Sequence, residues 1–314
     1  MERLVRERAI ALGHAIDPRT HLAYSSHLRS YFTFCKLHGF SIEPTIDTLS
    51  FYTIYMSCQI QPRSVNSYLS GISHELEHVF PEIRQNRKSS LVTRTLKGAM
   101  KLYSNPIKRK RPLTIEDLSV LLLAFPPTSH DNLLFSTILL SGFFALHRLG
   151  ELTIPDNPAL LESRKIIRRS SVTLSPSQYG YNLPAHKGDK FFASSDVLVA
   201  ESSDQINPLA IFQLYLNSRD SLFPFHFQLF LTSDGSPPSR TWFLSRLQSI
   251  LHDNVAGHSL RSGGATYFAS CGWPDEQIQK LGRWSTRQFE SYVRTHPVIL
   301  QALLHSRHPE PSMA

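Results

Sequence analysis

Apolar residues in the first 104 positions recur at intervals of three or four, which is the spacing of amphipathic α-helices. One helix is expected to begin at Asp17 and Pro18, an N-cap followed by a proline suited to the first helical turn, and to end before Gly39. Further helical segments are predicted over 47–58, 62–81 and 90–103. The pattern therefore predicts an all-α domain of four or five short helices over 1–104.

From residue 113 onward, helix spacing alternates with strand spacing. The segments QYGYNLPAH and KFFASSDVLVA have strand character and flank Lys187, Gly188 and Asp189, which predicts a β-hairpin with its turn at these residues. Helical spacing covers the ranges 114–125, 130–146, 207–219 and 240–252. The chain is therefore expected to be mainly α with a small β-hairpin sheet, its second domain being an α+β domain over 113–314.

A basic segment joins these two regions. The net charge of the chain is +8, and no acidic residue occurs between Glu82 and Glu116. The cations of this interval are Arg84, Arg87, Lys88, Arg94, Lys97, Lys101, Lys108, Arg109, Lys110 and Arg111. Pro106 and Pro112 bracket the last four, so we place an interdomain linker at 105–112. Such residues attract a nucleic-acid backbone, and they fit a nuclear localisation signal or a solvated linker equally well.

The length and the cysteines limit the class of protein. At 314 residues the chain is long for a single core, which agrees with two domains. Its three cysteines are far apart and have no zinc-site spacing, so we expect a reduced compartment, no metal and no cofactor. The charged N-terminus and the lack of an eighteen-residue apolar run predict a soluble, intracellular protein without membrane contact.

The stretch GHSLRSGGATYFASCGWPDEQIQKLGRWSTRQFESYV combines residues suited to chemistry on an anion. His258 and Arg261 project from the first turns of one helix, and the small residues after them allow close packing. Arg283 and Trp284 form the turn after the next helix, and Tyr292 falls on a short helix predicted to follow. Taken singly, a capping histidine, a surface arginine and a buried tyrosine explain these positions as well.

Upstream, SGFFALHRLGEL places Arg148 and Glu151 three residues apart near the end of an apolar helix. At this spacing Glu151 can orient the guanidinium of Arg148 toward an anion. The alternative is an arginine whose aliphatic stem lies along an apolar surface while its charge reaches water.

The whole set resembles the active-site signature of the tyrosine recombinase, or phage integrase, superfamily. The residues in chain order are Arg148, Lys187, His258, Arg261, Arg283, Trp284 and Tyr292. Tyr292 follows Arg283 by nine residues, as the nucleophile of the family follows its penultimate His or Trp. Here Arg283 takes that slot with Trp284 beside it, so both are candidates, and Lys190 is a rival to Lys187.

The sequence segments HSLRSGGAT and LGRWSTRQFESYVR are most similar to those of recombinases from eukaryotic Crypton-type mobile elements. The helical region 1–104 likewise resembles the core-binding domain of the family, which contacts DNA, and 113–314 its catalytic domain. The resemblance therefore covers nearly the whole chain.

The resemblance implies a metal-independent transesterification on DNA. Tyr292 would attack the scissile phosphate, His258 would accept its proton and Lys187 would protonate the departing 5′ oxygen. A 3′-phosphotyrosyl link would form. The charge on the phosphate would be stabilised by Arg148, Arg261 and either Arg283 or Trp284.

The resemblance also implies double-stranded DNA as partner and a homotetramer on that DNA. The apolar face of 297–307 predicts a C-terminal helix that fits packing on its own domain and docking on a neighbouring protomer equally well. We expect recombination for integration or excision of a mobile element, in the nucleus of a eukaryotic host or otherwise in the cytoplasm. Two alternatives stay open: a DNA-binding protein of recombinase descent that no longer cuts, and a nicking enzyme similar to type IB topoisomerases.

Overall fold

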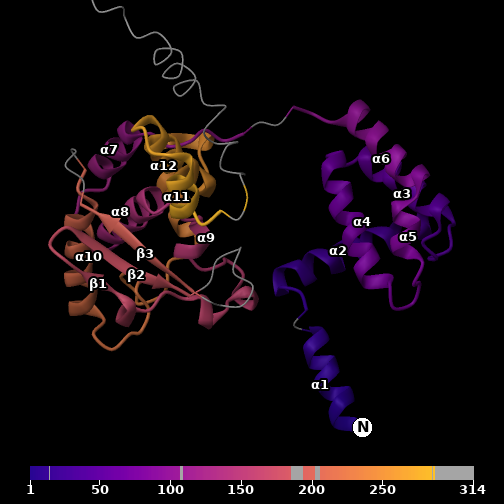
Figure 1. Ribbon diagram of the computed structural model, residues 1–314, viewed down its shortest axis with the longest axis horizontal. Coiled ribbons are helices and arrows are strands. Elements are labelled where there is room, and N and C mark those ends of the chain that lie inside the picture. The colour runs from indigo at the N-terminus through magenta and orange to yellow at the C-terminus, as the bar shows by residue number, and fades with distance from the viewer. Residues whose placement is uncertain (14, 107–108, 185–193, 202–205, 285, 287–314) are drawn as a thin grey trace, which may run out of the picture. The chain divides into compact units, whose positions relative to one another are not determined.

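The protein forms two compact units, Met1–Lys108 and Arg109–Ala314, each with its own hydrophobic core (Figure 1). The computed structural model describes residues 1–13, 15–106, 109–184, 194–201, 206–284 and 286. The boundary between the units falls inside the basic segment 105–112.

The first unit is helical throughout its regular structure. Its helices are α1 (Glu2–Gly13), α2 (Pro18–His38), α3 (Ile46–Ser57), α4 (Pro62–Leu76), α5 (Ile83–Lys88) and α6 (Ser90–Tyr103). Asp17 caps α2 by accepting a hydrogen bond from the Arg19 amide, and Gly39 ends it in the left-handed conformation (φ 69°), as predicted. The core joins the aromatic faces of α2 and α3, where the rings of Tyr31 and Tyr52 meet edge to face.

Two details of this unit differ from the sequence prediction. The helix predicted over 62–81 ends at Leu76, because the amides of Val79 and Phe80 turn back to the Leu76 carbonyl and bring Phe80 against the core. The described residues also include α1 and α5, which makes six helices where four or five were predicted. α1 buries none of its side chains and α5 has only six residues, so each has a weak periodic signal.

The second unit packs helices against a small antiparallel sheet. Its helices are α7 (Ile115–Ala124), α8 (His130–Phe144), α9 (Leu149–Leu152), α10 (Pro208–Leu222), α11 (Arg240–Leu251), α12 (Gly257–Ser270) and α13 (Asp275–Leu281). Its strands, in the order β1-β2-β3, are β1 (Thr173–Leu174), β2 (Gln178–Leu183) and β3 (Ser195–Ala200). The β2–β3 hairpin is therefore present as predicted, while its expected turn at 187–189 lies outside the described residues.

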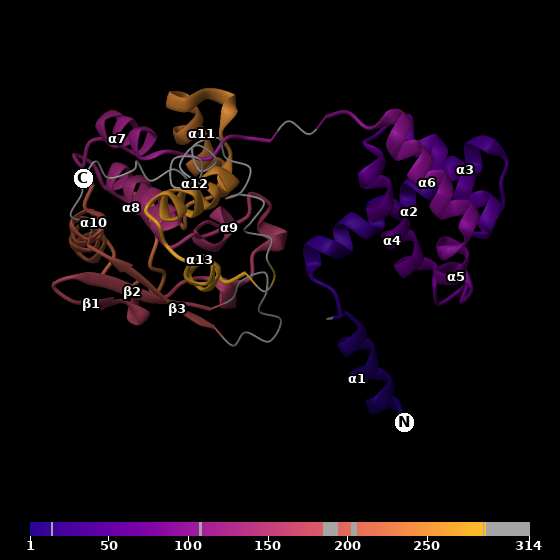
Figure 2. The same cartoon turned by 45° about the horizontal axis from the view of Figure 1, so that its top comes forward.

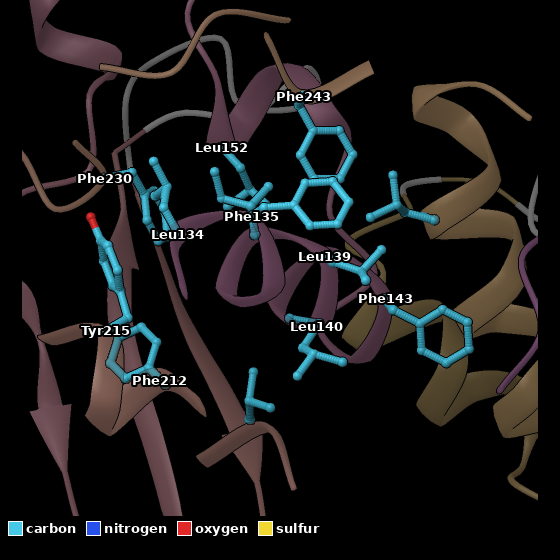
Figure 3. Packing of buried hydrophobic residues seen from close by; sticks show 14 of the residues in the cluster. Leu134, Phe135, Leu139, Leu140, Phe143, Leu152, Phe212, Tyr215, Phe230 and Phe243 are labelled. Atoms are coloured by element: carbon cyan, nitrogen blue, oxygen red, sulfur yellow. The ribbon is translucent and has the colours of Figure 1, made fainter. Parts of the chain in front are cut away.

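α8 is the central helix of the second unit, and nearly all its residues are buried. A helix that is apolar all round is stable only when neighbours cover every side. Figure 3 shows Phe212 and Tyr215 of α10 on one side of α8, Phe243 of α11 next to Phe135, and Phe143 pointing toward α12.

Glycines allow α12 to lie very close to α8. A Cβ on Gly264 would lie 2.0 Å from the carbonyl oxygen of Phe143, and a Cβ on Gly142 would lie 2.7 Å from the Leu260 side chain. The predicted close packing of the small residues after Arg261 is therefore present. It fixes Arg261, one turn before Gly264, at the end of α8. Figure 2 shows α9, α12 and α13 gathered in this part of the unit.

Candidate active site

Arg148 lies beyond α8 rather than within it. The helix predicted over 130–146 ends at Phe144, two residues earlier, and Leu146 takes a left-handed conformation (φ 51°). Arg148 is instead the N-cap of α9. The Leu146 carbonyl accepts a hydrogen bond from Nη1 of Arg261 at 2.6 Å. A left-handed leucine costs about 1–3 kcal/mol, which a hydrogen bond from a charged donor, worth about 1.5–3 kcal/mol, can offset.

Glu151 holds the side chain of Arg148 in place. Its Oε1 accepts from Arg148 Nη1 at 2.9 Å, and its Oε2 accepts from the Arg148 amide at 3.1 Å. Nη2 of Arg283 lies 3.5 Å from the same Oε2. Burial acts to raise the pKa of Glu151, but the hydrogen bond from His147 and the nearby charges outweigh it and hold the pKa well below its usual range. Glu151 is therefore an anion that orients Arg148, as its spacing predicts.

Arg261 is only 1% exposed. Its Nη1 donates to the Leu146 carbonyl and its Nη2 to the Gly282 carbonyl. Its guanidinium carbon lies 4.1 Å from the centre of the Trp284 ring, a cation–π contact worth roughly 0.5–2 kcal/mol. Arg261 thus connects the ends of α8 and α13 to the first turns of α12.

Trp284 is part of a buried cluster. The other members are Leu146, Ala265, Phe268 and Ile278. A Cβ on Gly282 would lie 1.7 Å from the Trp284 ring, so no larger residue fits there while the ring covers Arg261. Trp284 therefore contacts Arg261 rather than projecting from the protein.

Arg283 has different surroundings from its neighbour Trp284. Its backbone is left-handed (φ 53°), and its side chain turns toward Glu151 and the Ala145 carbonyl, with Nη2 3.4 Å from that oxygen. Burial lowers the pKa of Arg283, and the charge of Glu151 opposes that shift. Arg283 and Trp284 are the two candidates for the position that precedes the tyrosine in the motif. Of the two, Arg283 is the one whose side chain lies with Arg148 and Glu151.

His258 lies on the exposed side of the first turn of α12. Partial desolvation, followed by the charges of Arg261 and Arg148, lowers its pKa. A lowered pKa keeps the imidazole neutral near pH 7, which is the form that accepts a proton. His258 therefore has the protonation state that a general base needs, beside two arginines.

Two further residues of this site were missed by the sequence analysis. His147 is fully buried, with Nδ1 3.1 Å from Oε2 of Glu151 and Nε2 2.8 Å from the Tyr181 hydroxyl. Burial lowers the pKa of His147 to about 4 and raises that of Tyr181 well above its usual value. Two signals were available in the sequence, because His147 directly precedes Arg148 and Tyr181 shares the alternation of Tyr179 along β2.

These side chains gather positive charge. Arg148 and Arg283 pair with the carboxylate of Glu151, and Arg261 lies near enough for its charge to lower the pKa of His147, which is neutral at pH 7. A cluster of positive charge attracts anions. Guanidinium groups match the oxygens of a phosphate with paired donors. The arrangement is suited to a phosphodiester.

Several predicted site residues fall on parts of the chain that the structure does not describe. Lys187, its rival Lys190, Tyr292 and the segment 297–307 lie outside the described residues. Within the described part, no group of three or more His, Cys, Asp or Glu residues is arranged to hold a metal ion. No helix of that part is long and apolar enough to cross a membrane.

The predicted DNA-binding cations are mostly exposed. Some make hydrogen bonds or ion pairs within the chain, such as Arg84 with Glu77, Arg87 with Asn66 and Ser70, and Arg111 with Asp117. The exposed cations are Arg84, Lys88, Arg94, Lys97, Lys101, Arg109, Lys110 and Arg111; Arg87 is partly buried, and Lys108 lies outside the described residues. Exposed cations of this kind can meet a DNA backbone.

No protein-family model matches the sequence, and no curated protein matches it. The fold, by contrast, is shared with solved structures. The Tn1549 transposon integrase in complex with circular intermediate DNA matches with a TM-score of 0.57 and 14% identity, over 98% of this chain and 97% of that one. The chain has the tyrosine recombinase fold.

Two structures of lambda integrase support the same fold. A dimer bound to a COC′ core site matches with a TM-score of 0.55 and 14% identity, over 91% of this chain and 95% of that one. A tetramer bound to a Holliday junction matches with a TM-score of 0.58 and 13% identity, over 92% and 76% of the two chains. The predicted fold class of a mainly α tyrosine recombinase with a small sheet is confirmed.

Proposed function

We propose that the protein is a site-specific tyrosine recombinase that cuts and rejoins double-stranded DNA. The observation that carries this proposal is the pairing of Arg148 and Arg283 with Glu151, with Arg261 hydrogen-bonded to the nearby carbonyls of Leu146 and Gly282, within the tyrosine recombinase fold. In phosphoryl transfer the non-bridging oxygens gather negative charge, and preorganised donors aimed at that charge lower the barrier. The guanidinium groups of Arg148, Arg261 and Arg283 are donors of this kind.

In the proposed reaction, the Tyr292 oxygen attacks the scissile phosphorus and its proton passes to His258. The bond from phosphorus to the 5′ oxygen breaks, and Lys187 gives that oxygen a proton. The products are a 3′-phosphotyrosyl link and a free 5′-hydroxyl. Attack by the 5′-hydroxyl of a second strand reverses these steps and releases Tyr292. A base is needed because an unperturbed tyrosine has a pKa of about 10 and is protonated near pH 7.

Besides Arg148 and Arg261, a third residue is expected to donate a hydrogen bond to the phosphate. We assign this bond to Arg283 rather than to Trp284. The contacts of Arg283 with His147 and with Glu151, which holds Arg148, support this assignment. Trp284 is 8% exposed, and its ring stacks on Arg261. These contacts support a structural role for Trp284, in which its ring holds that guanidinium in place.

DNA binding would involve the exposed cations of α6 and of the basic segment, which suit contacts with backbone phosphates. The similar solved structures include a dimer on a core site and a tetramer on a Holliday junction, which supports a tetramer of this chain on DNA. The segment 297–307 is the candidate contact between protomers. The motif resemblance to Crypton-type recombinases supports a mobile-element role and nuclear residence in a eukaryotic host.

A suicide-substrate assay tests the proposal. Nicked DNA from the flanks of the gene is incubated without Mg²⁺ with wild-type, Tyr292→Phe and Tyr103→Phe protein, Tyr103 being an exposed tyrosine of the first unit. We expect a covalent adduct on a denaturing gel with wild type and Tyr103→Phe but not with Tyr292→Phe. An adduct that survives in Tyr292→Phe contradicts the assigned nucleophile. DNA retardation without any adduct favours the non-cutting DNA-binding protein.

A further inference from the structure

His147 is a buried polar residue that the proposed reaction does not use directly. It is 0% exposed, and each ring nitrogen meets a polar partner: Nδ1 meets Oε2 of Glu151 at 3.1 Å and Nε2 meets the Tyr181 hydroxyl at 2.8 Å. The rings of His147 and Tyr181 are nearly parallel, 12° apart, with centres separated by 5.8 Å. The imidazole is thus held on both sides.

The partners determine which nitrogen carries the proton. A carboxylate only accepts hydrogen bonds, so Nδ1 must donate to Glu151. Nε2 then has a free lone pair, and the Tyr181 hydroxyl donates to it. Nη2 of Arg283, 3.2 Å from Nδ1, cannot donate to a protonated nitrogen and is therefore directed to Glu151 and the Ala145 carbonyl. The chain of donors runs from Tyr181 through His147 to Glu151.

On the basis of the proposed function, we infer that His147 is a positioning residue for DNA cleavage. Its Nδ1–H fixes Oε2 of Glu151, and Oε1 then holds the guanidinium of Arg148 toward the scissile phosphate. Tyr181 sets the orientation of the imidazole from β2.

Three features support this role over packing alone. The Glu151 oxygens are divided, with Oε1 on Arg148 Nη1 and Oε2 on the Arg148 amide and His147, so rotation of the carboxylate would break bonds to both residues. The second feature is the need for a hydrogen-bonding side chain. A hydrophobic residue of similar volume would fill the same space but would leave Oε2 of Glu151 and the Tyr181 hydroxyl each with one hydrogen-bond partner fewer.

The third feature is charge. Burial keeps the pKa of His147 at about 4, so the ring donates to Glu151 without adding a positive charge that would compete with Arg148 for the carboxylate. Among the residues that the structure describes, Glu151, Arg283 and Arg261 are the charged groups that act on the ring, and Tyr181 is the titratable group hydrogen-bonded to it. A neutral donor is what this position requires.

Two amide substitutions separate the ring nitrogens. The amide nitrogen of His147→Asn reaches the place of Nδ1 and keeps a donor to Glu151, whereas that of His147→Gln reaches the place of Nε2 and does not. For both variants and wild type, single-turnover adduct formation is measured at saturating DNA, together with the DNA Kd and a thermal melt. The ¹⁵N NMR spectrum of the His147 ring in the free wild-type protein gives its tautomer independently of cleavage.

We expect His147→Asn to cleave within a few-fold of wild type and His147→Gln to be slower by about tenfold to a hundredfold, with equal Kd. We also expect a neutral ring with its proton on Nδ1. Equal rates in both amide variants, while wild type forms adduct, would overturn the inference and leave the proposed function intact. If wild type forms no adduct, the proposed function fails, and a spectrum with the proton on Nε2 or a ring midpoint near pH 6.5 overturns the inference too.

If either amide variant does not fold, the spectrum of the wild-type protein and the cleavage rate of Tyr181→Phe decide the matter. We then expect Tyr181→Phe to be slower by a few-fold. A rate equal to that of wild type would contradict the inference.

Discussion

Two buried arginines of the second unit, Arg219 and Arg261, are each 1% exposed, yet their surroundings differ. Arg219 donates to the carbonyls of His226 and Gln228 and, at 2.9 Å, to the neighbouring Asp220. Arg261 also donates to two carbonyls, but beside it are Trp284 and further arginines.

Burial does not by itself mark an arginine as catalytic. Arg219 lies next to a carboxylate and attaches the segment after α10 to that helix, while Asp220 also pairs with Arg169. In the candidate site, the Glu151 carboxylate is held by Arg148 and His147. Arg219 pairs directly with a carboxylate outside that site, whereas Arg261 belongs to the cluster proposed to bind a phosphate. Arg219 is therefore a natural control for Arg261.

The largest expected effect comes from removing the carboxylate of each region. The Glu151 side chain is 7% exposed and that of Asp220 is 39% exposed. Glu151→Gln leaves buried cations together and should lower the free energy of unfolding by about 3–5 kcal/mol. Water can screen the loss in Asp220→Asn, which should cost about 1–2 kcal/mol. Urea unfolding of both variants measures the difference, and equal losses would contradict the contrast.

The second prediction concerns catalysis. Arg261→Lys keeps the charge but loses the planar fork of donors, so adduct formation should slow by about 100-fold, equivalent to about 2.7 kcal/mol. Arg219→Lys should lower stability while its cleavage rate stays within a few-fold of wild type. Both rates are measured at a temperature where circular dichroism shows each variant folded. A slow Arg219→Lys would show that the second unit is sensitive to any buried arginine.

The third prediction concerns the pH dependence of stability. The pKa of His147 falls from 6.5 to about 4 on folding, so below pH 6.5 the unfolded chain takes up a proton that the folded protein excludes. The free energy of unfolding should therefore fall toward pH 4, by at most about 1.4 kcal/mol per pH unit from this group, and should be unaffected by it above pH 6.5.

The Arg219 region should not respond in that window. The pKa of Asp220 is lowered from 3.8 by its arginines against the effect of burial, so its contribution is present above pH 3.8 and is lost only at lower pH. Urea midpoints of wild type and His147→Asn between pH 4 and 7.5 isolate the histidine, since His27 and His258, whose pKa values are also lowered, are common to both proteins. Parallel curves would contradict the assignment.

Sequence patterns predict the parts of this fold that local chemistry determines. The Asp17 cap, the Gly39 stop and the helix after Thr114 all follow from neighbouring residues, and each is found where expected. The left-handed Leu146 does not follow, because the hydrogen bond that stabilises its carbonyl comes from Arg261, 115 residues later. A pattern of neighbouring residues does not show which distant residue will form such a hydrogen bond.

The same limit applies to the candidate site. Residue types and order are enough to nominate Arg148, Arg261 and Arg283, and the spacing of Glu151 predicts its contact with Arg148. The stacking of Trp284 on Arg261 and the link from β2 through His147 depend on how distant segments pack. The roles of Lys187 and Tyr292 stay predictions.

In the proposed mechanism, the positive charges of Arg148, Arg261 and Arg283 neutralise the scissile phosphate. Once the cleavage position is mapped from the adduct, wild-type and Arg148→Gln proteins are compared on a phosphodiester and on an uncharged methylphosphonate at that position. Arg148→Gln should be slower by about 100-fold or more on the phosphodiester. On the methylphosphonate the deficit should shrink to a few-fold, because one negative charge is gone from the substrate. An equal deficit on both substrates would contradict charge neutralisation as the function of this cluster.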